Sequence, residues 1–173
     1  VVTRDADTIL AADKVILPGV GAFGDAMGRL TQYGLVEVIR RVADRGTPFL
    51  GICLGLQLMF ESSEESEGVK GLSLLPGKIL RIPDGEGMKI PHMGWNSLKI
   101  RPESRLFRNI PDGAYVYFVH SYYLKADCPE QVAASAEYVT HIHAAVESGN
   151  LFACQFHPEK SSCLLYTSDA ADE

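Results

Sequence analysis

The sequence contains few cysteines, and those present form no recognisable pattern. There is no CxxC pair and no spacing typical of a disulfide framework, so we expect a protein of the reducing cytoplasm. The four cysteines are Cys53, Cys128, Cys154 and Cys163. Metal-ligand spacing is also lacking among the histidines, including His92, His141 and His143, and no metal site is expected.

Long apolar runs and excess positive charge are lacking too. No run approaches the roughly 20 apolar residues of a membrane span, and the N-terminus has no charged-then-apolar signal pattern. Sixteen Lys and Arg residues stand against 22 Asp and Glu, which gives a net charge of -6. We therefore expect no nucleic-acid or membrane partner. A length of 173 residues without repeats or linkers suits one domain with a sizeable core.

The most informative stretch is a cysteine flanked by glycines. Residues 49–53 predict a buried strand, and residues 54–60 predict a helix. Between them, Gly51-Ile52-Cys53-Leu54-Gly55 has the G-x-nucleophile-x-G pattern of a hydrolase elbow, with cysteine in place of serine. Glycine on each side permits a sharp turn, and the helix N-terminus is expected to favour the thiolate of Cys53. The alternative is a free cysteine packed in the core.

Before the elbow, strand and helix patterns alternate. We expect the end of a strand at 1–3, a short helical linker at 5–13, a strand at 14–17, and helices at 22–32 and 35–44. This alternation predicts a parallel sheet with right-handed crossovers. The strand at 14–17 leads into a glycine-rich turn, which suits the binding of an oxyanion, although most Pro-Gly pairs are plain turns.

After the elbow, the pattern changes to an acidic loop and short β-like segments. The loop at 61–68 is expected to be a solvated connection. The β-like segments predict an antiparallel or mixed flank on the parallel core, and so an α/β fold. They lie at 78–82, 97–100, 114–122, 132–138, 143–146 and 151–156.

His157 and Glu159 supply the groups that a thiol nucleophile needs. An imidazole can take the thiol proton at neutral pH and return it to a leaving amine. The carboxylate two residues later can fix the imidazole tautomer and favour the imidazolium. Both Cys53 and His157 follow predicted strands, so we expect one sheet edge to bring them together.

These motifs resemble those of class I glutamine amidotransferases. The resemblance rests first on GICLGLQ (51–57) and FHPEK (156–160). Four further stretches resemble the glutaminase subunits of imidazole glycerol phosphate synthases: PGVGAFGDAM (18–27), FESSEE (60–65), KIPHMGWN (89–96) and YFVHSYY (117–123). The resemblance implies a class I glutamine amidotransferase fold of the flavodoxin-like, three-layer type. Its mixed, mainly parallel sheet is flanked by helices.

The resemblance also implies roles for individual residues. Cys53 would attack the glutamine amide, with His157 moving protons and Glu159 orienting His157. The oxyanion hole would use Leu54 N–H and the loop of Gly19, Val20 and Gly21. Glutamine would be held by Gln57, Glu65, His120, Ser121 and Tyr122. Three of these residues have a structural alternative. Gln57 also suits a solvated helix residue, Glu65 one more acid of the loop, and His120 a satisfied core histidine.

The implied partner is a (β/α)-barrel cyclase subunit in a heterodimer. Ammonia would pass to it for synthesis of imidazole glycerol phosphate and an aminoimidazole carboxamide ribonucleotide in histidine biosynthesis. The interface would include Trp95, Asn96, Tyr117 and Lys160. Trp95 lies in a Pro/Gly-flanked loop, which suits an interface anchor, although Trp95 and Tyr117 also suit a core. No cofactor is implied, and Cys154 is expected to be inert.

Two departures from the family pattern concern the ends of the chain. The family's first strand, glycine-rich turn and helix are absent before Val1, and its C-terminal amphipathic helix is absent after Ser162. We expect a truncated amidotransferase domain at 1–162 and a non-native tail at 163–173.

Three alternatives stay open: the glutaminase of another synthase, a non-catalytic regulatory module, and a cysteine peptidase. The PHMGWN stretch argues against another synthase. The intact Cys53, His157 and Glu159 argue against a non-catalytic module, and Gln57 argues against a peptidase.

Overall fold

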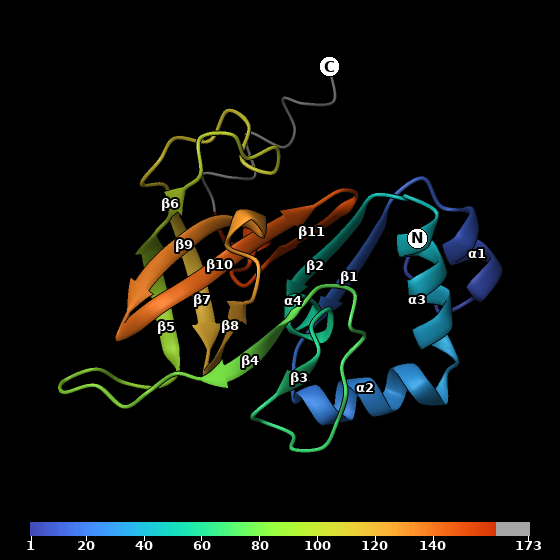
Figure 1. Cartoon of the computed structure of the whole chain (residues 1–173), viewed down its shortest axis with the longest axis horizontal. Helices are drawn as coiled ribbons and strands as arrows, with labels where there is room; N and C mark the ends of the chain where they lie inside the picture. The colour runs from blue at the N-terminus through green and yellow to red at the C-terminus, as the bar shows by residue number, and fades with distance from the viewer. Residues whose placement is uncertain (162–173) are drawn as a thin grey trace.

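The apolar run before the cysteine forms strand β2 inside a six-stranded sheet (Figure 1). The computed structural model describes residues 1–161. The strands run in the order β1, β2, β11, β10, β9, β6. Their bounds are Val15–Gly19 for β1, Phe49–Cys53 for β2, Leu151–Cys154 for β11, Thr140–Ser148 for β10, Val132–Tyr138 for β9 and Lys99–Ile100 for β6.

The sheet is mixed, as predicted, but it is not mainly parallel, because its parallel pairings are confined to one end. Strands β1, β2 and β11 pair in parallel, whereas β11, β10, β9 and β6 pair antiparallel. The parallel register places Ile52 beside Cys154, so β2 and β11 end at the same edge. This edge is where the predicted nucleophile and base follow their strands.

The described residues contain four α-helices, of which the first three gather at the N-terminal, blue end of the molecule in Figure 1, while the fourth lies nearer the middle, after β2. They are α1 (Ala6–Ala11), α2 (Phe23–Gln32), α3 (Leu35–Asp44) and α4 (Leu54–Leu58). Helix α3 buries Val38, Ile39 and Val42, the stripe that its 3.6-residue period predicts. Helices α2 and α3 have the predicted positions, whereas α4 is shorter than the predicted 54–60.

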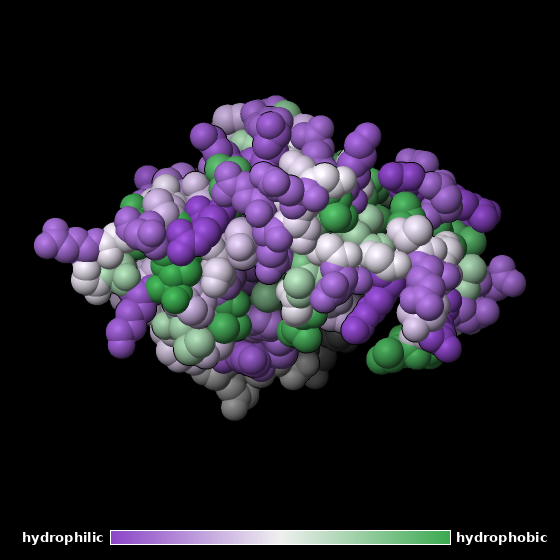
Figure 2. Space-filling view, turned by 90° about the horizontal axis from the view of Figure 1, so that it is seen from below, coloured by the Kyte–Doolittle hydropathy of each residue, from purple (hydrophilic) through white to green (hydrophobic). Residues whose placement is uncertain are grey.

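Two smaller sheets cover the opposite end. One contains β3 (Ser62–Ser63), β4 (Gly77–Arg81) and β8 (Tyr122–Ala126), and the other pairs β5 (His92–Ser97) with β7 (Tyr115–His120). Short 3-10 turns lie at η1 (Pro129–Gln131) and η2 (Pro158–Lys160). Seen from below, the surface in Figure 2 is mostly hydrophilic, with small hydrophobic groups separated from one another.

The core consists of two apolar clusters on opposite faces of the main sheet. Strand β11 shows the division, because Leu151 and Ala153 belong to one cluster while Cys154 belongs to the other. This is the period-2 alternation of a strand buried on both faces. Within residues 1–161, no helix combines the length and the apolar character needed to cross a membrane.

Four predicted elements were wrong. The predicted strand 97–100 is divided at Leu98, because Ser97 ends β5 and Lys99–Ile100 is β6, in another sheet. Residues 1–3 form no strand, and Val1 and Val2 are exposed, because no neighbouring strand pairs with them. The predicted strand 114–122 is broken at Ser121, because β7 and β8 belong to different sheets. The predicted loop around Trp95 is strand β5, paired along its length with β7. The predicted tail at 163–173 lies outside the described residues.

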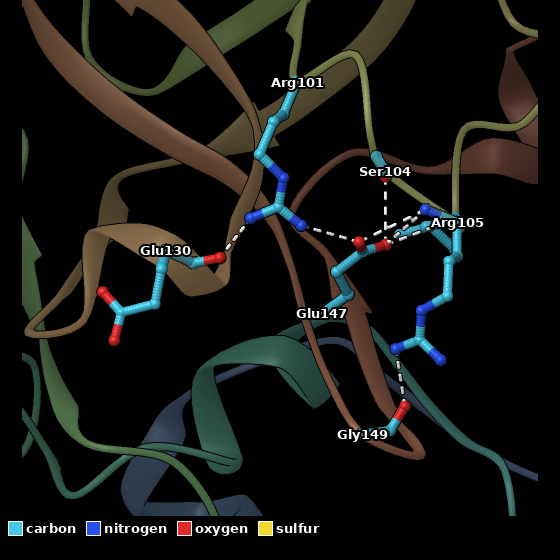
Figure 3. A network of polar contacts seen from close by, with 7 residues as sticks. Arg101, Ser104, Arg105, Glu130, Glu147 and Gly149 are labelled. Atoms are coloured by element: carbon cyan, nitrogen blue, oxygen red, sulfur yellow. Dashed lines mark hydrogen bonds and ion pairs between the residues drawn. The ribbon is translucent and has the colours of Figure 1, made fainter.

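Glu147 on β10 anchors the loop that follows β6 (Figure 3). Its carboxylate, 6% exposed, accepts hydrogen bonds from Arg101 Nη2 (2.7 Å), Ser104 Oγ (3.0 Å) and the backbone N–H groups of Arg105 and Leu106. Burial alone would raise the pKa of Glu147, but these hydrogen bonds together hold it below its ordinary value. The ionised carboxylate therefore stabilises the fold.

We expect Glu147→Gln to lower the free energy of unfolding at pH 7 by about 2–4 kcal/mol, because several donors lose a charged acceptor. Because its folded-state pKa is lowered, Glu147 contributes stability above its unfolded value of about 4.5. That contribution disappears as the pH falls through the folded pKa. Urea unfolding of both proteins between pH 7 and pH 3 should show the difference shrinking with acidification.

The control is Glu137→Gln, which removes the exposed partner of His141 and should change the free energy of unfolding by no more than about 0.5 kcal/mol. Equal losses in the two variants, or a Glu147→Gln effect that persists at pH 3, would contradict the assigned role.

Candidate active site

The cysteine turn has the strained backbone of a nucleophile elbow. Cys53 is the last residue of β2 and caps α4, with φ 56° and ψ -111°. Residues other than glycine rarely adopt this backbone conformation. A Cβ added at Gly55 would lie 1.8 Å from Leu17 O, and one at Gly51 would lie 2.7 Å from Met59 Sδ. Both glycines are therefore required by the close approach of neighbouring atoms, and the predicted elbow is confirmed.

The Cys53 thiol is 9% exposed, and its environment pulls its pKa in opposite directions. Burial, the largest effect, raises the pKa, and the negative charge of Glu159 raises it further. The Leu54 backbone N–H, the Gln155 side chain and Lys160 lower it without reversing the net increase. The Leu54 N–H at the start of α4 favours the thiolate, as predicted. The prediction is wrong for the net effect, because the pKa of Cys53 is raised overall.

His157 and Glu159 form the predicted pair. His157 Nδ1 lies 2.7 Å from Glu159 Oε1, so the carboxylate holds the proton on Nδ1 and leaves Nε2 able to act as a base. The His157 side chain is 7% exposed, and its backbone N–H donates to Tyr117 O at 3.0 Å. Ser161 Oγ donates to His157 O at 2.7 Å, so the backbone of the histidine is held from two sides.

The predicted nucleophile and base open onto one cavity of about 390 Å³. The same cavity is bordered by the residues predicted to bind glutamine and by part of the predicted oxyanion loop. Its lining comprises Val20, Gly21, Cys53, Leu54, Gln57, Glu65, Pro91, Val119, His120, Ser121, Tyr122 and His157. The expectation that a shared sheet edge brings Cys53 and His157 together is confirmed.

The glycine-rich turn after β1 lies beside the elbow. Gly19 pairs with Cys53 at the ends of β1 and β2, and Gly21 has a φ of 100°. Between them, Val20 is 82% exposed. The Leu54 N–H is directed toward the Cys53 sulfur. The Leu54 N–H and the glycine-rich turn thus both border Cys53, a position from which backbone donors could serve a developing oxyanion.

Gln57 is buried and committed to partners within the chain. Its Nε2 donates to Tyr122 O and to Gln155 Oε1, each at 3.1 Å. Gln155 in turn donates through Nε2 to Cys53 Sγ at 3.8 Å. Sequence reasoning missed Gln155, because both its burial and its contact with Cys53 are visible only in the folded structure.

Glu65 has a structural contact in addition to its place in the cavity. Its Oε2 accepts a hydrogen bond from Phe23 N at 2.8 Å, and Ser66 Oγ accepts one from Gly24 N at 3.0 Å. These contacts satisfy the N-terminus of α2, whose Ala22 cap has no side-chain acceptor. The acidic loop is therefore partly an anchor for α2 and not only a solvated connection.

Three of the four residues predicted at the interface are contiguous. Trp95 on β5 is 51% exposed, and its ring lies 6.0 Å from that of Tyr117 on β7 in an edge-to-face arrangement. Lys160 Nζ lies 5.7 Å from the centre of the Tyr117 ring. Asn96 differs, because its amide is turned inward to His92 and to Glu137 O.

His120 borders the cavity and is also a satisfied buried histidine, so both interpretations of it apply. It contacts His92, a residue that sequence analysis considered only as a metal ligand. Burial raises the pKa of Cys154, in line with its predicted inertness. Within residues 1–161, no group of three or more His, Cys, Asp or Glu side chains is placed to hold a metal ion.

A family model and curated relatives give the same family for this chain. The family model described as glutamine amidotransferase class-I matches residues 2–165. A relative from Moorella thermoacetica, named imidazole glycerol phosphate synthase subunit HisH, is 55% identical over 161 residues, covering 93% of this chain and 76% of the relative. The protein of the same name from Geobacter metallireducens is 50% identical over 169 residues, covering 95% and 80%.

Solved structures agree at the level of the fold. A crystal structure of a glutamine amidotransferase superimposes with a TM-score of 0.72 at 16% identity, covering 96% of this chain and 82% of that one. The glutaminase domain of Trypanosoma brucei CTPS gives 0.66 at 17% identity, covering 97% and 74%. The chain belongs to the class-I glutamine amidotransferase family, in the branch formed by the HisH subunits of imidazole glycerol phosphate synthase.

Proposed function

We propose that the chain is the glutaminase subunit of imidazole glycerol phosphate synthase and that it hydrolyses glutamine at Cys53. The observation that carries the chemistry is the single cavity shared by Cys53 at a strained elbow and by His157 paired with Glu159. The subunit assignment rests on the relatives of the same name at 50–55% identity. Ammonia released here serves histidine biosynthesis.

The reaction proceeds through a thioester. Cys53 loses its proton to His157 Nε2, and the thiolate attacks the side-chain amide carbon of glutamine. The tetrahedral intermediate collapses as the imidazolium returns a proton to the leaving nitrogen, which departs as ammonia. Water activated by His157 then attacks the glutamyl thioester and releases glutamate and the thiol. Glu159 keeps the proton on Nδ1 throughout.

The oxyanion of each tetrahedral intermediate is stabilised by Leu54 N–H and by a backbone N–H of the Gly19-Val20-Gly21 loop. Each such donor is worth about 2.7–4 kcal/mol in the transition state. A loop peptide turned away from the cavity would remove one donor and lower kcat while leaving glutamine bound. The positive φ of Gly21 and the exposure of Val20 make this peptide a suitable switch.

Glutamine is held by the groups that border the cavity around Cys53. Because both amide hydrogens of Gln57 are committed to Tyr122 and Gln155, Gln57 offers the substrate its carbonyl oxygen Oε1. Glu65 offers the carboxylate that suits the substrate's amino group, and His120, Ser121 and Tyr122 line the same cavity.

The partner is a (β/α)-barrel cyclase subunit that binds the outer face of β5 and β7 and receives the ammonia. This face carries the exposed side chains of Met93, Trp95 and Tyr115, together with Tyr117 under Lys160. Aromatic residues, methionine and a flanking cation are typical of interface cores. The Tyr117 carbonyl accepts from His157 N, so the interface strand also holds the catalytic segment.

The free thiols of Cys53, Cys128 and Cys154 favour a cytoplasmic location.

Replacement of the nucleophile is the primary test. Cys53→Ser should abolish ammonia release from glutamine while leaving glutamine bound, because a serine hydroxyl lacks thiolate character at neutral pH. Ammonia release is measured with the cyclase subunit present, and glutamine binding is measured by calorimetry. Cys128→Ser, which alters a cysteine outside the cavity, should retain activity. Substantial hydrolysis by Cys53→Ser would refute the assignment.

The roles of base and orienter can be separated. His157→Ala should lower kcat by about 10²-fold or more, which is the contribution of general acid–base catalysis. Glu159→Gln should cost less, because the amide can still accept from Nδ1 but no longer favours the imidazolium. Steady-state glutaminase kinetics compare the two. Equal losses, or no loss in Glu159→Gln, would show that the roles are wrongly assigned.

The partner surface is tested with Trp95→Ala. The variant should weaken activation by the cyclase and its nucleotide substrate while leaving partner-independent hydrolysis within about twofold, since Trp95 lies outside the cavity. We expect the partner to raise kcat far more than it lowers KM, as restoring one oxyanion donor would do. Full kcat without a partner, or a partner effect confined to KM, would contradict the switching model.

A further inference from the structure

A pair of buried histidines lies between the interface strands and the cavity. His92 on β5 and His120 on β7 are cross-strand partners, 3% and 6% exposed, with His92 Nδ1 3.0 Å from His120 Nε2. The His92 ring is stacked between Phe118 at 4.6 Å and Tyr138 at 3.9 Å. Two imidazoles at hydrogen-bond distance in an apolar setting require one defined arrangement of protons.

The neighbouring groups determine that arrangement. His120 Nδ1 lies 2.9 Å from Tyr122 O, which can only accept, so the His120 proton is on Nδ1 and Nε2 is the acceptor. His92 must then donate from Nδ1, which leaves its Nε2 to accept from Asn96 Nδ2 at 3.4 Å. Burial lowers the pKa of each histidine to about 4, so both rings are neutral at physiological pH.

The same chain of hydrogen bonds continues to the nucleophile. Tyr122 O accepts a second hydrogen bond, from Gln57 Nε2, and Gln57 donates its other amide hydrogen to Gln155 Oε1. Gln155 Nε2 then lies 3.8 Å from Cys53 Sγ. Because each acceptor in this series fixes the orientation of the next donor, a single amide orientation of Gln57 and Gln155 satisfies all contacts.

We propose that the His92–His120 pair is a positioning device for the nucleophile, which holds Tyr122 O and, through Gln57, the Gln155 N–H that faces Cys53 Sγ. His92 and Gln155 are positioning residues for the reaction proposed above, on which the kinetic part of this inference rests. Loss of the His92 donor leaves His120 Nε2 buried without a partner, which favours a rotated or protonated His120 and releases Tyr122 O. The Gln155 N–H is then directed at Cys53 Sγ for a smaller fraction of the time.

Two substitutions at the same residue separate positioning from packing. His92→Asn places an amide nitrogen close to the position of Nδ1 and so retains a donor to His120. His92→Gln extends its amide toward the position of Nε2, retains a partner for Asn96 and removes the donor to His120. The two variants lose the same stacking between Phe118 and Tyr138, so packing affects them alike.

The readout is the pH dependence of Cys53 alkylation by iodoacetamide, which reports the thiolate without requiring glutamine. We expect His92→Gln to move the midpoint for Cys53 upward by about 0.5–1 pH unit and to lower kcat about tenfold. We expect His92→Asn to retain the wild-type midpoint. Modified Cys53 is quantified by peptide mass spectrometry, which separates it from the other cysteines.

A double-mutant cycle with Gln155→Ala tests the route. Gln155→Ala should raise the midpoint by itself, and adding His92→Gln should then have no further effect, because the two residues act in series. Additive shifts, or equal effects of His92→Asn and His92→Gln, would overturn the proposal and leave the pair as core packing. Loss of thermal stability in both variants without a shift in midpoint would overturn it in the same way.

Failure of the proposed function would be seen separately. A wild-type protein whose Cys53 is alkylated with a defined midpoint but which releases no ammonia with its partner would contradict the glutaminase assignment. The same data would still decide whether His92 and Gln155 position the thiolate.

Discussion

The parallel pairing of β2 with β11 is the constraint on which the candidate site depends. It makes two strands that are distant in the sequence end at one edge, so that Cys53 and His157 open onto the same cavity. The pairing places Gly51 and Ala153 side by side, and the sharp turn after β2 then brings Gly55 against the Leu17 carbonyl. The strained backbone of Cys53, a cost of about 1–3 kcal/mol, is offset by this packing.

The candidate site combines a buried residue, Cys53 as the proposed nucleophile, with a partly solvated one, Glu159 as the proposed orienter of His157. Burial opposes ionisation of Cys53, while the N–H groups of Leu54 and Gln155 favour it. Glu159 has a side chain that is 56% exposed, so its charge is partly screened, and its defined contribution is the 2.7 Å contact that orients His157. Ionisation of Cys53 is thus favoured mainly by these oriented donors, with a smaller contribution from the charge of Lys160.

The parts of the fold that were predictable from sequence are those determined by local pattern. The elbow follows from two glycines around Cys53, and helix α3 follows from an apolar stripe of period 3.6. Strand β5 was not predictable, because a histidine, a glycine and an asparagine interrupt the β-formers in His92–Ser97, and the strand exists only through its pairing with β7. Two contacts leave no local signal, because they join segments far apart in the sequence. They are the contact of Glu65 with α2 and that of Gln155 with Cys53.

Tyr117 has contacts on both of its sides. Its carbonyl accepts from His157 N, its N–H donates to Ser161 Oγ, and its ring lies against Trp95 and below Lys160. Trp95 is the only tryptophan in the chain. Its indole therefore provides a native optical reporter for the segment that contains His157. A shift of the His157 backbone would change the surroundings of the fluorophore through Tyr117, so tryptophan emission could follow the proposed base in real time without an added label.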